Sequence, residues 1–262
     1  MSFTGKSPSE TYKDILQIDN SNSGVDSTTR ILKTGEGTSS SLSLSDRSLQ
    51  VKSNTDNNKA LNVINSSNST KFNVDTTNNI VKALGHHVNT QYAYFGIASG
   101  VGANITADRH YVVPFAGNAN TASLADNFDL GTGTDPATSF TTADGASTDA
   151  SVVVPCLWLV PDNISIDGVY SLEGGDNATG GTTRMHLMSY TFTSGSTSAL
   201  TSGTLLAHNS DVTNAGSEQA YKSTWTVDSA SVAADKVILA TFLTTDITGD
   251  YSASVIVKYH LT

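Results

Sequence analysis

Between Ser40 and Leu84 the chain repeats a short pattern in which two apolar residues flank one polar residue. Such a triplet places both apolar side chains on one face of a β-strand, because successive side chains point to opposite faces. The triplets begin at positions 42, 49, 61 and 72, and the residues between them are mostly Asn, Ser, Asp and Thr, which favour turns. The pattern therefore predicts very short strands with one apolar face, formed by Leu42, Leu44, Leu49, Val51, Leu61, Val63, Phe72 and Val74.

One copy of this segment has too few apolar side chains to form a core. Ordering the backbone costs about 1–2 kcal/mol per residue, and stacked repeats are stable only when they bury a continuous core. Three identical chains wrapped about one axis would cover the apolar stripe of each with its two copies. We therefore expect a homotrimeric β-repeat shaft with those eight residues at the trimer axis. The alternative is a disordered, low-complexity linker, which the Asn-, Ser- and Thr-rich composition also permits.

Denser apolar segments follow Leu84 and predict the strands of a C-terminal head. Short strands separated by Gly, Asp, Asn and Thr turns are typical of an all-β fold, here an antiparallel β-sandwich resembling a jelly roll. A barrel-like single sheet is the alternative. Residues 116–150, which are rich in Ala, Thr, Gly and Asp, are expected to cross the surface or to reach a neighbouring subunit. The expected strands are 110–115, 152–160, 164–172, 185–192, 221–227, 237–243 and 251–261, with a further one near 203–208.

The first 33 residues form a distinct segment. Tyr12, Ile15, Leu16 and Ile18 cluster there without enough apolar sequence nearby to make a domain. Such a patch needs a surface that another protein supplies. The expected organisation is therefore an anchoring segment at 1–33, a shaft at 34–84 and the head at 85–262.

Composition and charge exclude several classes of partner. Of the 262 residues, 37% are hydrophobic and 15% are charged, and the net charge is −10. Residues 86–262 hold sixteen acidic and five basic side chains, so the head would repel phosphate backbones and we expect no nucleic-acid partner. The sequence has neither an apolar run of 18 residues nor a charged-then-apolar N-terminus, so we expect no membrane insertion and no secretory signal.

Metal-binding and catalytic motifs are absent from the sequence. The six histidines form no His-Glu-x-x-His motif and no cluster with metal-ligand spacing. Three copies of His86 or His87 around an axis would offer three imidazoles to a metal, and the alternative is a polar junction. The aspartates at 126, 129, 135, 144 and 149 do not match the spacing of a calcium loop, so they are expected to be turn residues.

The remaining candidates for chemistry also favour structural roles. Cys156 lies in an apolar run and is expected to be a small buried side chain rather than a nucleophile. Glu173 has no catalytic motif around it, so we expect no enzymatic activity and no cofactor. Trp158 lies in a continuous apolar run and is expected in the core, whereas the neighbours of Trp225 leave its exposure open. The alternative is a sugar-stacking platform made from Trp158, Trp225, Tyr221, Tyr190 and Tyr94.

Two stretches of the chain resemble fibre-like virion proteins of tailed bacteriophages, notably marine ones. The run ETYKDILQIDNSNSGVD at 10–26, followed by TGEGTSSSLSLS at 34–45, is similar to the N-terminal region of these proteins. The run FNVDTTNNIVKALGHHVNTQYA at 72–93 is similar to their passage from shaft to head. The resemblance covers roughly the first 97 residues, and the head resembles jelly-roll receptor-binding domains only in its strand pattern.

The resemblance implies a homotrimeric structural protein on the surface of a virion, assembled in the host cytoplasm. The N-terminus would dock on another virion protein, and the head would project toward a host-surface glycan or protein. The first expectation is a tail fibre or a stubby tail spike for host adsorption, because the shaft is short. The alternative is a capsid-bound head fibre or decoration protein that stabilises the shell. A depolymerase ranks third, because neither an acid pair nor an extended parallel β-helix is visible.

Overall fold

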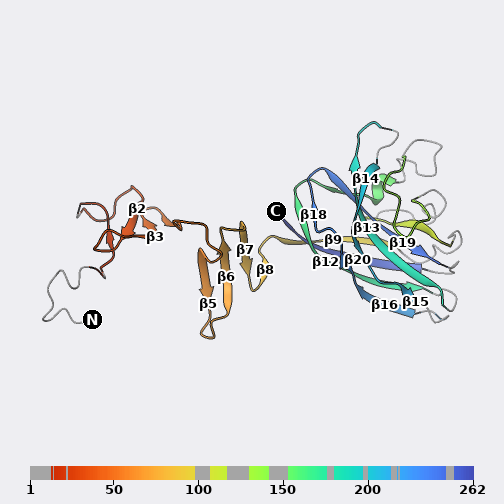
Figure 1. Cartoon of the computed structure of the whole chain (residues 1–262), viewed down its shortest axis with the longest axis horizontal. Coiled ribbons are helices and arrows are strands. Elements are labelled where there is room, and N and C mark those ends of the chain that lie inside the picture. Colours follow the sequence, from red (N-terminus) through yellow and green to blue (C-terminus); the bar gives the residue numbers. More distant parts are fainter. Residues whose placement is uncertain are drawn as a thin grey trace. The chain divides into compact units, whose positions relative to one another are not determined.

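The computed structural model describes residues 13, 15–21, 23–97, 107–116, 130–141, 153–175, 180–196, 200–213, 217, 219–245 and 251–262. The chain divides into two compact units, Met1–Val88 and Asn89–Thr262. Apart from short helical turns, among them Val154–Cys156, the regular structure of the described residues is antiparallel β-sheet, so the expected all-β class is confirmed (Figure 1). The division lies four residues after the expected boundary between shaft and head.

The first sheet of the N-terminal unit contains one pair of the predicted short strands. Leu42 lies opposite Val51 and Leu44 opposite Leu49, so the four apolar side chains share one face. The turn is held by Ser45, whose Oγ accepts hydrogen bonds from the backbone N–H groups of the two residues before the next strand. The strands, in sheet order, are β1 (Gln17–Ile18), β2 (Arg30–Lys33), β3 (Ser39–Leu44) and β4 (Leu49–Val51). The expected boundary between residues 33 and 34 falls in the turn that joins β2 to β3.

The second sheet has the same arrangement, except that three of its strands, rather than two, contribute side chains to the apolar face. Its strands, in order, are β5 (Leu61–Ile64), β6 (Thr70–Asp75), β7 (Ile80–Ala83) and β8 (His86–His87). Leu61 lies opposite Val74, and Val74 opposite Val81, while Val63, Phe72 and Ala83 form the neighbouring row. The residues between them are Asn62, Asn73 and Lys82, so this sheet has one apolar and one polar face.

The described residues of the N-terminal unit contain no buried apolar side chain. Asp75 is the one buried residue among them, and its carboxylate accepts hydrogen bonds from Asn78. Leu49 is 64% exposed, Val63 50% and Leu61 41%. The hairpins therefore have paired strands but no interior of their own.

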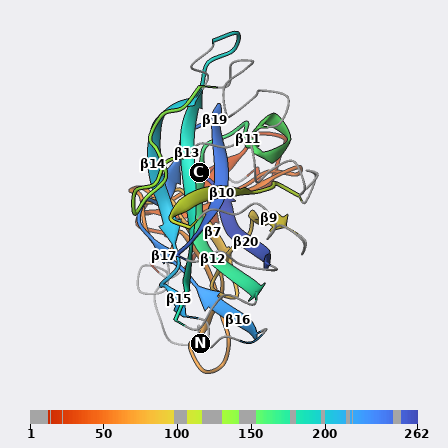
Figure 2. The same ribbon diagram turned by 90° about the vertical axis from the view of Figure 1, so that its right-hand side faces the viewer.

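The C-terminal unit is built from two packed sheets (Figure 2). We call the first the β9 sheet, whose main order is β16 (Gln219–Thr224), β12 (Ile164–Gly175), β20 (Tyr251–Leu261) and β9 (Thr90–Ile97), with β18 (Ser231–Val232) beside β12. We call the second the β10 sheet, whose main order is β10 (Arg109–Val113), β19 (Lys236–Thr244), β13 (Thr182–Phe192), β14 (Leu200–His208) and β17 (Thr226–Val227), with β11 (Trp158–Val160) beside β19 and β15 (Val212–Thr213) beside β13.

The strand pairing is that of a jelly roll. The first long strand of the head pairs with the last, β9 with β20, and the second with the next to last, β10 with β19. The innermost pairs are β12 with β16 and β13 with β14. These four nested pairs form a long two-stranded ribbon that is rolled into the two layers, the arrangement expected from the strand pattern.

Two apolar clusters hold the head together. The larger lies between the sheets, where Phe95, Val169 and Val255 of the β9 sheet meet Met185 and Phe242 of the β10 sheet. The smaller covers the outer face of the β10 sheet, where Leu130, Phe140, Val153 and Cys156 pack on Val112, Met188, Tyr190 and Leu239. The described part of the expected surface excursion, 130–141, is therefore a cover for this sheet.

Gly203 on β14 permits the close approach of this cover. Its N–H donates to the carbonyl oxygen of Thr138 at 2.7 Å. A Cβ at position 203 would lie 2.8 Å from Cα of Thr138 and 2.7 Å from Cε1 of Tyr190. A side chain at position 203 would therefore push the covering segment away from the sheet.

The expected strand at 152–160 is wrong in its first half. Val154–Cys156 form a 3₁₀ turn, and the strand begins only at Trp158. The reason is Pro155, which has no N–H to donate to a neighbouring strand. The structure also adds β9, which the expected strands did not include.

Candidate functional site

The expected docking residues lie at the start of the described chain. Tyr12 lies outside the described residues. Ile15 and Leu16 are 42% and 59% exposed. Ile18 belongs to β1, lies opposite Leu32 of β2 and is half-buried. Ile15 and Leu16 are therefore accessible to a partner surface, whereas Ile18 is partly covered within the first sheet.

The eight expected shaft residues pair among themselves. Each of the two hairpins brings two pairs of apolar side chains to one face of its sheet. No described residue buries any of them. The structure thus groups the eight residues into two open apolar faces, which are the first candidate functional surface.

The candidate metal residues fall into two groups. His86 and His87 form β8 and lie opposite Ala83 and Lys82 of β7. Of the aspartates considered for calcium, those at 126, 129, 144 and 149 lie outside the described residues. Asp135 is described, and its Oδ1 lies 3.6 Å from Nε2 of His186.

The aromatic residues proposed for sugar stacking do not form an exposed platform. Trp158 is buried, as expected for a core residue, and so are Trp225 and Tyr190. Nε1 of Trp225 donates to Oγ of Ser171 at 2.9 Å. Tyr94 is the exposed member of the set, with 53% of its surface accessible. Cys156 is buried as well, and burial raises the pKa of its thiol to about 12, so it is not activated as a nucleophile.

A buried carboxyl group lies between the two sheets at Glu173 of β12. Oη of Tyr251 donates to its Oε2 at 3.1 Å, and Oε1 accepts from Nδ2 of Asn209 at 3.2 Å and from Oγ of Ser223 at 3.3 Å. Oδ1 of Asn209 accepts in turn from the backbone N–H of Met185 on the β10 sheet. The network therefore links β12, β16 and β20 of one sheet to the other sheet.

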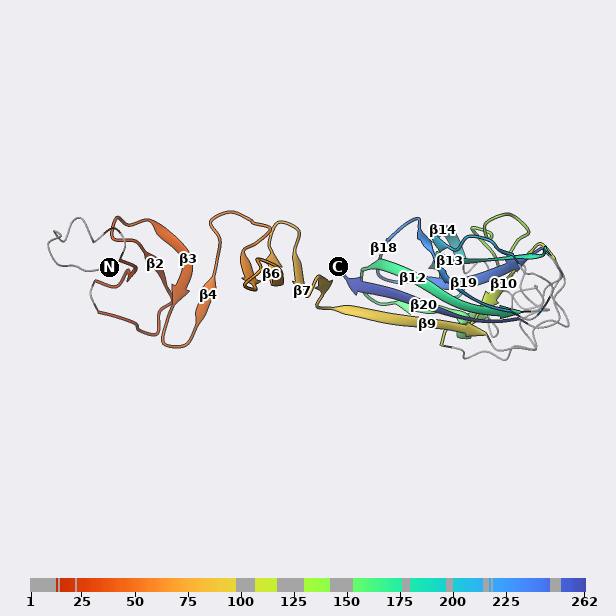
Figure 3. The ribbon, with the colours of Figure 1, turned by 90° about the horizontal axis from the view of Figure 1, so that it is seen from below.

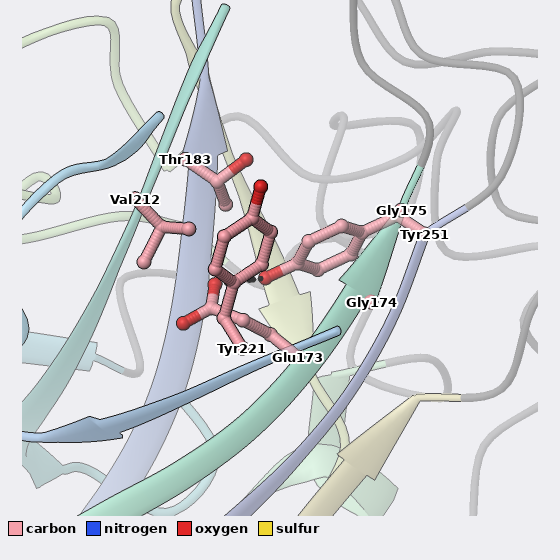
Figure 4. Close-up of a pocket in the computed structure, with 7 residues that line it drawn as sticks. All are labelled: Glu173, Gly174, Gly175, Thr183, Val212, Tyr221 and Tyr251. Atoms are coloured by element: carbon pink, nitrogen blue, oxygen red, sulfur yellow. Dashed lines mark hydrogen bonds between the residues drawn. The ribbon is translucent and has the colours of Figure 1, made fainter. Parts of the chain in front are cut away.

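The space beside Glu173 is small. Figure 4 shows the hydroxyl of Tyr251 pointing to the carboxyl group, whereas the hydroxyl of Tyr221 points away from it; Thr183 and Val212 also line the space. The centre of a water molecule has about 10 Å³ available there, room for about one water. Burial raises the pKa of Glu173, although its hydrogen-bond donors oppose the shift. The geometry suits a polar link between the sheets.

A second buried polar cluster lies on the outer face of the β10 sheet. The rings of His110 and His186 pack edge to face with centroids 5.1 Å apart. Nε2 of His110 donates to the carbonyl oxygen of Gly133 at 2.8 Å. Both ring nitrogens of His186 and Oγ1 of Thr241 are buried without a hydrogen-bond partner among the described residues.

Burial, and to a smaller extent the neighbouring His110 and Arg184, lower the pKa of His186 to about 3. Asp135 is 3.6 Å away and its side chain is 56% exposed, too distant for a hydrogen bond and well screened by water. Desolvation therefore outweighs the carboxylate, and His186 is neutral near pH 7.

The outer side of the β9 sheet exposes large side chains that the sequence analysis did not single out together. Tyr92 and Tyr94 are each 53% exposed, Leu172 is 58% and Tyr170 37%. On β9 the intervening residues Ala93 and Phe95 are buried, and on β12 the residues that follow Tyr170 and Leu172, Ser171 and Glu173, are buried. Residues 92–97 carry apolar or aromatic side chains on both faces, so alternation in the sequence does not reveal which face of this strand is outward.

No protein-family model matches the chain, and no curated protein is significantly similar to it. No helix in the described residues is long and apolar enough to span a membrane.

Proposed function

We propose that the chain is a structural protein of a tailed-bacteriophage particle, a homotrimeric fibre or spike whose head adsorbs to the host surface. The observation that carries the proposal is the open apolar face of both N-terminal hairpins. A sheet without a core is not expected to be stable alone, whereas burial of a Leu or Val side chain contributes about 1.5–3 kcal/mol. Copies of the same chain offer the matching surface.

The parts of the chain then have separate roles. The exposed Ile15 and Leu16, with Tyr12 and Ile18, dock on another virion protein. The paired residues of the shaft join the three copies. The jelly-roll head meets a host glycan or protein, and it has no catalytic role in this proposal.

The assembly is tested by sedimentation equilibrium of the full chain. We expect three times the 27.3 kDa mass of one chain. The double variant Leu61→Ser/Val63→Ser removes apolar surface and should lower the sedimentation mass at micromolar concentration. Asn62→Ser is the matched control, because Asn62 lies on the polar side of the same strand. A monomeric full chain at micromolar concentration would contradict the proposal.

The adsorption role is tested with particles that lack the chain. If the head binds the host, such particles should lose adsorption to host cells while their shells stay intact. Normal adsorption combined with earlier rupture would instead show a capsid-bound protein that stabilises the shell.

A further inference from the structure

The outward side of the β9 sheet carries a continuous apolar row. Tyr94 of β9 lies opposite Ile256 of β20, which lies opposite Tyr170 of β12. Tyr92 and Leu172 flank the row on the same side. Figure 3 shows the three strands side by side, with β9 at the margin of the sheet. We call these five residues the tyrosine face, and no described segment covers it.

The charge of the tyrosine face differs from that of the rest of the head. The outward positions of β9 from Thr90 to Gly96 are uncharged. Lys222 and Lys258 lie beside the row, and Asp167 is paired with His260 at 3.0 Å. The head as a whole holds sixteen acidic and five basic residues, whereas the described positions beside the tyrosine face carry two lysines and one aspartate that is bonded to a histidine. Among the described residues, copies that meet through this side bring together Lys222 and Lys258 but no carboxylate other than Asp167, so the acidity of the head does not oppose the contact.

The sequence connects this face closely to the shaft. Val88 and Asn89 are the residues between β8 and β9, and two residues span at most about 7 Å. Copies joined through their shafts would thus hold their β9 strands on short tethers. A short tether raises the effective concentration of one head at another to about the millimolar range once the shafts are joined. Tyrosine is also one of the residues enriched in protein interfaces and in their hot spots.

We propose that the tyrosine face is where the heads of this protein join, each face covered by two further copies of the chain. This inference rests on the proposed homotrimer. It assigns the contact surface of the head, so the surfaces available to a host receptor are the remaining ones.

The test is hydroxyl-radical footprinting of the full chain at a concentration where its sedimentation mass is known. Tyr92, Tyr94 and Leu172 should be modified at least fivefold more slowly than their exposure in one copy implies. Leu159, which is 59% exposed elsewhere on the head, is the internal control and should be modified at the rate its exposure implies.

A variant pair completes the test. Tyr94→Lys should raise the concentration at which the assembly dissociates at least tenfold, whereas Leu159→Lys should leave it unchanged, with the far-UV circular dichroism of both unaltered. A trimeric mass with Tyr92 and Tyr94 modified as fast as Leu159 would overturn this inference while the homotrimer stands. A monomeric mass would overturn the homotrimer itself.

Discussion

Oη of Tyr251 donates a hydrogen bond to Oε2 of Glu173 at 3.1 Å, and both groups are buried between the sheets of the head. Tyr251→Phe removes this donor and leaves the buried carboxyl group with one partner fewer. We expect the free energy of unfolding to fall by about 1–3 kcal/mol, measured by urea denaturation at one protein concentration.

Tyr259→Phe is the matched control for that change. Oη of Tyr259 donates to Oε1 of Gln91 at 2.9 Å in an exposed position, so its loss should cost less than about 0.5 kcal/mol. Equal effects of the two substitutions would show that the Glu173 network does not stabilise the head.

Protonation of His186 is expected to destabilise the head in acid. The pKa of His186 is lowered to about 3 in the folded chain, below its ordinary value of 6.5. The unfolded chain therefore binds the proton more readily between these values. The contribution of this group to stability is present above pH 6.5 and is lost as the pH falls toward 3, by up to about 1.4 kcal/mol per pH unit.

His186→Leu should remove this part of the pH dependence. Because both ring nitrogens lack a described hydrogen-bond partner, we expect the variant to be at least as stable as the wild type at pH 7. Thermal unfolding between pH 4 and pH 8 measures the effect. His208→Gln is the comparison, since His208 is partly exposed and bonded to Asp228. If the melting temperature of His186→Leu falls with decreasing pH as steeply as that of the wild type, His186 is not the source of this pH dependence.

Gly203→Ala should loosen the cover on the β10 sheet. The added Cβ would lie within 3 Å of Thr138 and Tyr190, and such overpacking costs about 1–3 kcal/mol. Limited proteolysis should then cut the covering segment sooner. Gly96→Ala is the control, because its Cβ would meet Ala253 at an ordinary 3.6 Å; the idea fails if both variants resist proteolysis as well as the wild type.

Replacing Ile15 and Leu16 by Ser should affect docking but not folding. Both side chains are exposed in the chain itself, so the melting temperature should change little. Particles assembled with the double variant should carry less of the protein, as measured by mass spectrometry of purified particles. A normal copy number would place the docking contact elsewhere.

The strands were predictable where the alternation of apolar and polar residues was regular. Leu61-Asn62-Val63 and Phe72-Asn73-Val74 define both their strands and their pairing, because only one register puts all four apolar side chains together. The pattern does not predict the strand at Thr90–Ile97, since the outward tyrosines make its two faces look equally apolar. It predicts a strand at Val154–Cys156 because the apolar content there outweighs the effect of Pro155.

The polar clusters could not be predicted from the sequence. Glu173, Asn209 and Tyr251 come from distant parts of the chain: Tyr251 reaches Glu173 because β20 lies beside β12, and Asn209, which follows β14, reaches it from the other sheet. No local spacing marks such a set. The same holds for His110 and His186, which lie on either side of β19.

The nested pairing of the head has a consequence for its biosynthesis. β20 lies between β9 and β12, and it leaves the ribosome after every other strand of the head. Until then β9 and β12 lack their shared neighbour, and pairings between residues so distant in sequence form slowly. The N-terminal hairpins, whose partner strands are local in sequence, leave the ribosome long before, so in the proposed homotrimer neighbouring nascent chains would have time to meet at the shaft before any head has closed.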